Sequence, residues 1–462
     1  MLSARLATIT VALTLLLATS GQAATWTAPA TLPTCAAASA PKVVFPFSWP
    51  SRRSGRGAIL WLGGAPDCTG AAGAAETLDS ATLHTDDLPS IPRVAAAHLE
   101  LLGPLESAGT SDGQLVAVVG DAEHPVGGRP GALLAEGHAG GPLPSITPLD
   151  GPDAPVATAD GYIGDADVVT TATALGGDQL IELREQRHFK SSFARPVVLI
   201  EGFAPITALA VGMDFRGDSL VLWAQGGQIH AQWVTNLRQV YPPQVLGPAG
   251  YAPQLAAVLS DNDHAFAMWT DEPPPGVAGE ARIFLEHSGN DVSFPADPRQ
   301  LVAFGEPAAQ RLTPGSIALV RVTPSEGVLA AWTFVQGGNY VVQAAGLTST
   351  QVLPAATIAL PGADLRLAGL ATGPDNDFVA VLESAPRSAT GFQLSQQSIL
   401  AARSVPGGPG GVAFEAPTQL APPGPNSAPS VAIDPDSDRA VVAWQTVSDG
   451  LPAVAYAVRG GA

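Results

Sequence analysis

The sequence is poor in charged residues and nearly lacks lysine. Only 14% of its 462 residues are charged, and Lys42 and Lys190 are its only lysines. Acidic residues outnumber basic ones by 41 to 22, which gives a formal net charge of −19. Binding to the phosphates of a nucleic acid requires clustered lysine and arginine, so the composition argues against a nucleic-acid partner. With 46% hydrophobic residues, the chain is also too apolar to be disordered.

Long hydrophobic runs are missing after residue 23. The one long run, Leu6–Leu17, follows Arg5 and is shorter than the roughly 20 residues that span a bilayer. Small residues follow it, with Gly21 and Ala23 at the positions that a signal peptidase prefers. We therefore expect a signal peptide at residues 1–23, a mature domain at residues 24–462, no membrane span, and a secreted or periplasmic protein.

Cysteine is scarce, because Cys35 and Cys68 are the only two. In an oxidising compartment, two cysteines this close in sequence favour a disulfide. A free reactive thiol or a metal pair is the alternative, but neither has supporting neighbours in the sequence. We predict a Cys35–Cys68 disulfide, which the chain-entropy estimate values at about 3–4 kcal/mol.

Amphipathic helical segments are also missing from the mature chain, and short Val- and Ala-rich runs separated by turn residues take their place. This pattern is typical of an all-β protein. A strand that ends in tryptophan recurs at Trp61, Trp223, Trp269, Trp332 and Trp444. The spacings of 162, 46, 63 and 112 residues fit a period of about 55, with the tryptophan replaced in some units. We predict a single β-propeller of about eight four-stranded blades, with seven as the alternative count.

A proline motif marks the fourth strand of each unit. The pattern apolar-x-x-Pro-x-x-Leu occurs around Pro196, Pro243 and Pro417. Proline cannot donate a hydrogen bond to a sheet, so it belongs on an edge strand. The last unit lacks this strand, whereas Trp26, Pro29 and Leu32 match it at the N-terminus. We therefore predict that the N-terminal strand completes the last blade and closes the ring.

These repeats resemble secreted bacterial β-propeller proteins, with units loosely similar to those of sialidase-type and WD40-like propellers. The resemblance covers residues 25–460 and rests on the period and the strand pattern. The Ser-x-Asp-x-Gly-x-x-Trp box of sialidases and the Gly-His and Trp-Asp marks of WD40 repeats are missing. The resemblance therefore implies a fold, but it assigns no role to any residue.

Catalytic sequence motifs are missing too. The sequence has no His-Glu-x-x-His, Gly-x-Ser-x-Gly or Walker motif. The turns between first and second strands are acidic, and their alternating carboxylates could bind calcium as a cofactor. Turn formation by Asp and Asn is the alternative. The best candidates for calcium are Asp434, Asp436 and Asp438.

The loops between second and third strands should gather on one face of the ring. Their acidic and histidine side chains are candidates for a ligand-binding face: Asp121, Glu123, His124, Asp271, Glu272 and Asp449. Such residues could bind a cation or supply paired carboxylates for glycoside chemistry, although exposed acids on an acidic protein are usually solvated surface.

These observations favour a secreted, monomeric, non-catalytic propeller that acts as a platform for an extracellular protein or glycan. The alternative is an extracellular carbohydrate-active enzyme, a glycosidase or lyase, that uses carboxylates at the propeller channel. A second alternative is a structural component of the cell envelope.

Overall fold

The computed structural model describes residues 25–32, 39–46, 57–64, 77–83, 89–90, 92–97, 101–109, 114–126, 129–138, 143, 145–149, 156–160, 165–173, 178–187, 192–202, 204–214, 216–260, 264–274, 277, 279–288, 293–295, 298–305, 316–322, 327–336, 339–348, 351–373, 376–386, 392, 394–406 and 412–460. The predicted signal peptide and both cysteines of the predicted disulfide lie outside these residues. No helix within them is long and apolar enough to cross a membrane.

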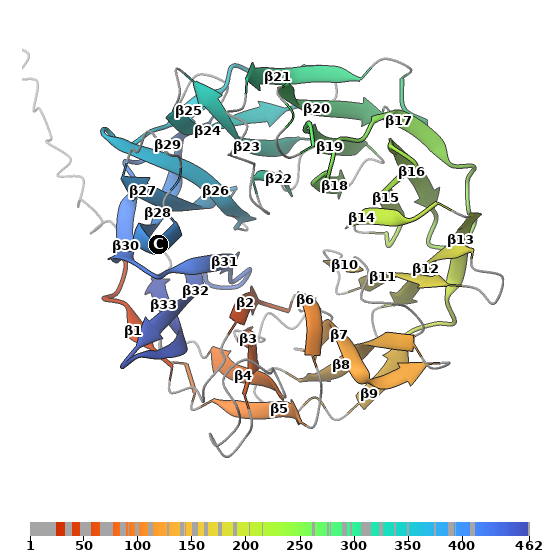
Figure 1. Cartoon of the computed structure of the whole chain (residues 1–462), viewed down its shortest axis with the longest axis horizontal. Coiled ribbons are helices and arrows are strands. Elements are labelled where there is room, and N and C mark those ends of the chain that lie inside the picture. The colour runs from red at the N-terminus through yellow and green to blue at the C-terminus, as the bar shows by residue number, and fades with distance from the viewer. Residues whose placement is uncertain are drawn as a thin grey trace, which may run out of the picture.

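The strands form eight antiparallel sheets arranged around a common centre, as the β-propeller prediction required (Figure 1). Listed from the inner to the outer strand, blades 1 to 4 consist of β2 (Ser39–Val44), β3 (Gly57–Gly63), β4 (Thr77–Leu83) and β5 (Arg93–Ala97); β6 (Leu101–Gly109), β7 (Gln114–Val126), β8 (Arg129–His138) and β9 (Ser145–Leu149); β10 (Val156–Asp160), β11 (Ala166–Thr173), β12 (Gln179–Gln186) and β13 (Val197–Gly202); and β14 (Ile206–Met213), β15 (Ser219–Gln225), β16 (Gln228–Val234) and β17 (Gln244–Pro248).

Blades 5 to 8 continue the same order, and blade 7 has two short outer strands. They consist of β18 (Leu255–Leu259), β19 (Ala265–Asp271), β20 (Glu280–Ser288) and β21 (Arg299–Gly305); β22 (Ile317–Arg321), β23 (Val328–Gln336), β24 (Asn339–Leu347) and β25 (Ala356–Ile358); β26 (Ala363–Thr372), β27 (Phe378–Pro386), β28 (Gln397–Pro406), β29 (Val412–Phe414) and β30 (Thr418–Gly424); and β31 (Ser427–Ile433), β32 (Ala440–Ser448), β33 (Leu451–Arg459) and β1 (Ala30–Thr31). One 3₁₀ turn, η2 (Leu394–Gln396), precedes β28.

The hydrophobic core lies between neighbouring blades. The recurrent tryptophans are on second strands, as predicted, and all five are buried. Trp223 of blade 4, for example, packs in one cluster with Val169 of blade 3, and Trp61 of blade 1 packs with Val441 of blade 8. Second strands are therefore buried on both faces, which explains why most of them are rich in apolar residues. Among the second strands of the third to eighth blades, β11 is the exception, with Asp167 and three threonines.

The N-terminal strand closes the ring, and this confirms the prediction from the proline motif. β1 pairs with β33, the third strand of blade 8. The Thr27 and Leu32 amides donate to the carbonyls of Val458 and Val454, both at 2.8 Å. Leu32 is only 4% exposed, and it packs in a cluster shared by blades 1 and 8.

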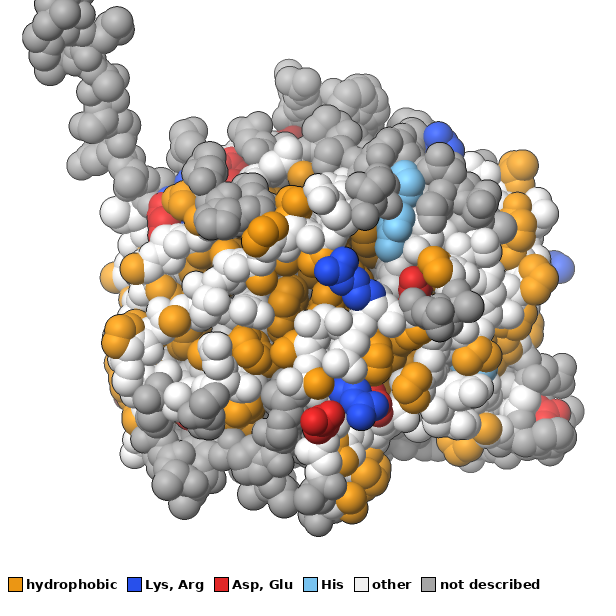
Figure 2. Space-filling model, turned by 90° about the horizontal axis from the view of Figure 1, so that it is seen from above, with side chains coloured by type: hydrophobic (Ala, Val, Ile, Leu, Met, Phe, Trp, Pro, Cys, Tyr) orange, Lys and Arg blue, Asp and Glu red, His pale blue; other side chains and the backbone are white. Residues whose placement is uncertain are grey.

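The outer strands also occupy their predicted positions. Pro29, Pro196, Pro243 and Pro417 each come directly before an outer strand, so the proline interrupts pairing where the strand begins. Seen from its edge, the ring presents scattered apolar side chains among uncharged ones, with few charged groups (Figure 2). This surface agrees with the low fraction of charged residues.

The antiparallel topology defines two faces of the ring. Hairpins between second and third strands and connections between successive blades share one face, which we call the hairpin face. Connections from first to second and from third to fourth strands share the opposite face, which we call the turn face.

Candidate functional site

A cavity of about 490 Å³ opens on the hairpin face between blades 6 and 7. Its lining comes from the β23–β24 hairpin, the connection between β25 and β26, and the first residues of β26. The lining residues are Gln336, Asn339, Tyr340, Val341, Ala359, Leu360, Pro361, Ala363 and Leu365. Apolar surface with a few amide groups and one aromatic ring is typical of a small-molecule site.

A buried arginine supports the wall of this cavity. The guanidinium carbon of Arg366 lies 4.5 Å from the centre of the Tyr340 ring and 4.1 Å from that of Phe392. Arg366 is only 5% exposed, so this cation–π stack is largely shielded from water, which strengthens it. The side chain is thus held between a residue that lines the cavity and one from the segment before η2.

The charge of Arg366 has a partner on the next strand. Glu383 lies opposite Arg366 in the β26–β27 pairing. Burial raises the pKa of Glu383, and the nearby Arg366 offsets part of that increase. Asp364 also has a hydrogen-bond partner within the protein, because one of its carboxylate oxygens accepts a hydrogen bond from the Tyr340 amide at 3.1 Å. None of these charged groups lines the cavity.

The acids predicted for a ligand face belong to the hairpin face but come from separate blades. Asp271 is the last residue of β19 in blade 5 and Glu272 follows it, whereas Asp449 is exposed in the β32–β33 hairpin of blade 8. The Arg282 guanidinium lies 4.0 Å from the Asp271 carboxylate, and burial raises the pKa of Asp271. Glu272 is buried. Asp271 and Glu272 therefore lie in a different blade from Asp449, and a shared ligand site for them stays a prediction.

Asp121, Glu123 and His124 lie within β7 of blade 2, where Asp121 pairs with Gly131. The structure does not describe their side chains. Asp449 has a local explanation of its own. With φ of 52° at Asp449 and 81° at Gly450, this pair forms the tight turn that favours Asp-Gly between two strands.

The acidic turn predicted to hold calcium lies on the turn face of blade 8. The Asp434 carboxylate accepts hydrogen bonds from the Asp436 amide at 3.0 Å and the Ser437 hydroxyl at 2.6 Å. Asp438 instead reaches Arg403, with an oxygen–nitrogen distance of 3.0 Å. Among the residues that the structure describes, no three His, Cys, Asp or Glu side chains converge as metal ligands would. These contacts match the alternative of turn formation.

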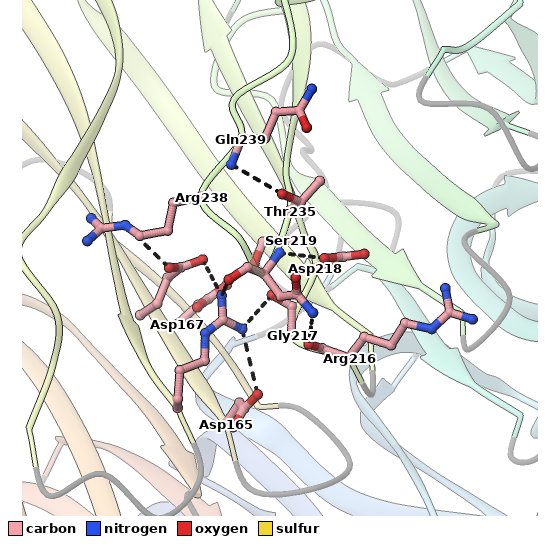
Figure 3. Close-up of polar contacts among 12 residues, drawn as sticks. Asp165, Asp167, Arg216, Gly217, Asp218, Ser219, Thr235, Arg238 and Gln239 are labelled. Carbon is pink, nitrogen blue, oxygen red and sulfur yellow. Dashed lines mark hydrogen bonds and ion pairs between the residues drawn. The ribbon is translucent and has the colours of Figure 1, made fainter.

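A group of charged side chains also lies on the turn face, between blades 3 and 4 (Figure 3). Arg187 is at its centre. One guanidinium nitrogen donates to the Gly217 carbonyl at 2.8 Å and lies 3.7 Å from Asp165. The other donates to Glu185 at 3.0 Å and to the Asn236 carbonyl at 2.9 Å. Arg187 therefore joins the third strand of one blade to the turns of the next.

Asp167 lies beside this arginine and is fully buried. Its carboxyl accepts a hydrogen bond from the Ser219 hydroxyl of blade 4. Burial raises the pKa of Asp167 well above its usual range, which favours the neutral acid. Since Asp167 is closed to solvent and the partners of Arg187 come from two blades, we interpret the cluster as a contact between blades.

The same arrangement recurs between blades 7 and 8. Arg403, near the end of β28, donates to Asp377 of its own blade and to Asp438 of the next, both at 3.0 Å. An arginine late in the third strand thus bridges two successive turns in both places. This repetition supports a structural role for the turn-face clusters.

Asp79 is a separate buried acid near the hairpin face of blade 1. It lies opposite Trp61 in the β3–β4 pairing and is 9% exposed. Gly63 makes room for it, because a Cβ at that position would lie 2.1 Å from an Asp79 oxygen. Burial raises the pKa of Asp79 from 3.8 to about 6, against the opposing effect of the Thr77 hydroxyl.

The raised pKa predicts that Asp79 destabilises the folded protein at high pH. The cost is absent below pH 3.8, grows as the pH rises to about 6, and is complete above it. A shift of this size corresponds to about 3 kcal/mol. We expect Asp79→Asn to raise the free energy of unfolding by up to about 3 kcal/mol at pH 8 and to change it little at pH 3, as measured by urea unfolding. Asp449→Asn, at an exposed turn, should change it at neither pH. An equal effect of Asp79→Asn at both pH values would contradict the prediction.

The residues around the cavity were not among the sequence candidates. Tyr340 and Arg366 are single residues in different blades, and no motif connects them. The one local signal is Gln336-Gly-Gly-Asn339, whose two glycines between strands predict a tight hairpin and therefore place two amides at its tip.

No protein-family model matches the sequence, and no curated protein sequence matches it. Solved structures do resemble it. A sialidase of Trypanosoma rangeli aligns with a TM-score of 0.35 and 10% identity over 92% of this chain and 55% of the sialidase. This chain thus spans little more than half of that enzyme.

Two further structures illustrate the range of the similarity. A polysaccharide lyase described as a PL25 ulvan lyase aligns with a TM-score of 0.43 and 10% identity, over 86% of this chain and 97% of the lyase. The Aleuria aurantia lectin aligns with a TM-score of 0.34 and 10% identity, over 68% of this chain and 94% of the lectin. At this level the similarity concerns the propeller architecture alone.

Proposed function

We propose that the protein is an exported, non-catalytic β-propeller platform that binds a neutral glycan in the cavity between blades 6 and 7. The observation that carries this proposal is the composition of the cavity lining. It combines two amide side chains, Gln336 and Asn339, with the apolar surfaces of Leu360 and Pro361. Amides can donate and accept hydrogen bonds with sugar hydroxyls, and apolar side chains pack against the C–H faces of a sugar ring.

The charge of the lining favours a neutral ligand. Tyr340 is the only titratable residue among the described residues that line it, so neither a cationic nor an anionic group finds a paired charge among them. The volume of about 490 Å³ falls within the range of small-molecule sites. Export is supported by the signal-peptide pattern of residues 1–23.

The enzyme alternative has less support at this cavity. Glycoside hydrolysis usually requires two carboxyl groups beside the scissile bond. The described lining residues include none, and the neighbouring Asp364 already accepts a hydrogen bond from the Tyr340 amide. A platform that positions a glycan without cleaving it therefore fits these residues better than a hydrolase.

Binding can be tested with an array of neutral oligosaccharides, followed by calorimetry on the best ligand. We expect Gln336→Ala to weaken binding about tenfold, and Asn339→Ala to do the same. Each substitution removes one amide group, whose hydrogen bonds to the ligand contribute about 1.4 kcal/mol in total. The chain offers a matched control in blade 4, where Gln225-Gly-Gly-Gln228 forms the equivalent hairpin and Gln228 is exposed. Gln228→Ala should leave the affinity unchanged.

Two results would overturn the proposal. Glycan binding that survives both cavity substitutions would place the ligand elsewhere. Reproducible turnover of a bound glycan, lost in the cavity variants, would make the protein an enzyme.

A further inference from the structure

Two histidines lie side by side on the turn face of blade 5, opposite to the face that carries the cavity. His264 directly precedes β19, and His287 lies near the end of β20. Phe266 pairs with His287 across these strands, so His264, two residues before Phe266, lies diagonally next to His287 on the same side of the sheet. The topology thus brings together two residues 23 positions apart in the sequence.

The two imidazoles point a nitrogen at each other. His287 Nε2 and His264 Nδ1 are 3.2 Å apart, and the ring centres are 5.3 Å apart with an interplanar angle of 23°. One of these nitrogens donates its hydrogen and the other accepts it. The accepting nitrogen is unprotonated, and its electron pair becomes available to a metal ion when the hydrogen bond is broken. At least one nitrogen is therefore already in the state that binds a metal.

The distance between the nitrogens matches that of two ligands on one metal ion. Histidine nitrogens bind zinc at about 2.0–2.1 Å, and a tetrahedral angle between two such bonds separates the nitrogens by about 3.3 Å. A metal ion could therefore replace the hydrogen bond at this separation, with each ring rotating until its nitrogen lone pair points at the ion. The proton of the donating ring would move to its far nitrogen, so both imidazoles would stay neutral.

The surroundings hold this pair in place. His264 is only 7% exposed, and the Ser260 amide donates to its carbonyl at 2.8 Å. The Phe266 ring lies 4.7 Å from the His287 ring, centre to centre. His287 is only half-buried, so solvent and ions reach the pair from its side. Preorganised ligands with an open side are what a metal site requires.

We propose that His264 and His287 form a two-histidine site for a divalent metal ion of the late first row, such as Zn²⁺, Ni²⁺ or Cu²⁺. Imidazole nitrogens favour these ions over Ca²⁺ and Mg²⁺, which prefer oxygen. Among the described residues, no third His, Cys, Asp or Glu groups with them, so these two histidines define the proposed site. The site is independent of the glycan cavity, and either proposal can fail without the other.

The test is a calorimetric titration of the full chain with ZnCl₂ after removal of bound metal. We expect saturable binding of one equivalent and a Tm that rises with the zinc concentration. His264→Gln and His287→Gln should each weaken binding at least tenfold and remove the rise in Tm. His138→Gln, at an exposed histidine of β8, is the matched control and should change neither. CaCl₂ should give no binding.

A second measurement covers the case in which a variant does not fold. In an NMR titration of the unmodified protein with zinc, the imidazole resonances of two histidines should shift, and those of the other histidines should not. No saturable binding, binding unchanged in both glutamine variants, or shifts at other histidines would overturn the proposal.

Discussion

A chain that begins at residue 35 is expected to be less stable than one that begins at residue 24 by about 4 kcal/mol. The shorter chain lacks the closing strand β1 and the buried Leu32. Truncation of a buried leucine alone costs about 2–5 kcal/mol. The deletion also leaves the β33 edge without its partner, including the hydrogen bonds at Val454 and Val458. Since a domain of ordinary stability has about 5–15 kcal/mol in total, the effect should be large.

Thermal and urea unfolding of the two chains measure this difference. Within the longer chain, Leu32→Ala should reproduce a substantial part of the loss, because it removes the side chain but keeps the strand. Leu237→Ala is the matched control, since that leucine is 87% exposed. If the two chains unfold at the same temperature and urea concentration, the ring does not depend on closure by the N-terminal strand.

Replacement of Arg403 by methionine is the second change with a large expected effect. Arg403 lies between the carboxylates of Asp377 and Asp438, with both nitrogen–oxygen distances 3.0 Å, and its side chain is 19% exposed. Removing one partner of a largely buried ion pair costs about 3–5 kcal/mol, since it leaves the opposite charge uncompensated. Here two acids from adjacent blades lose the same cation. The buried Arg459, which interacts with both acids and is repelled by Arg403, compensates part of their charge. We therefore expect a loss of about 3 kcal/mol at neutral pH.

The remaining carboxylates explain most of this loss, and the explanation can be tested. Both acids approach Gly373, where a Cβ would lie 2.1 Å from an Asp377 oxygen and 2.5 Å from an Asp438 oxygen. Without Arg403 the two charges therefore repel each other at short range. Adding Asp377→Asn and Asp438→Asn to Arg403→Met should restore more than half of the lost stability. Urea unfolding of the triple variant measures the recovery, and a triple variant less stable than Arg403→Met would refute the electrostatic account.

Sequence and structure agree on the features that repeat. The five tryptophans, the prolines before outer strands and the missing fourth strand of the last unit each predicted an element that the structure contains. Each of these signals depends only on the strand that contains it. A proline cannot donate a backbone hydrogen bond in any sheet. A second strand favours apolar residues because neighbouring blades cover both its faces. The number of blades followed from the same period.

The candidate sites show what the sequence pattern leaves open, and the reason is geometrical. Asp271 and Asp449 were grouped because both follow second strands, which correctly predicts their common face. Their blades, however, are three positions apart around the ring, so a shared face does not bring them together. Asp434 and Asp438 were chosen for their spacing, but the first bonds within its own turn and the second bonds to Arg403 of the neighbouring blade.

The sequence by itself determined the all-β class, the repeating strand order and the closure of the ring, because these depend on propensities and hydrogen-bonding limits that each strand carries locally. Only the tertiary structure decided which side chains meet. The stack of Arg366 on Tyr340, the bridge made by Arg187 and the pair of His264 with His287 depend on the offset and rotation of strands and blades against one another. That offset results from how the apolar side chains of successive blades interlock, and no single segment of the sequence encodes it.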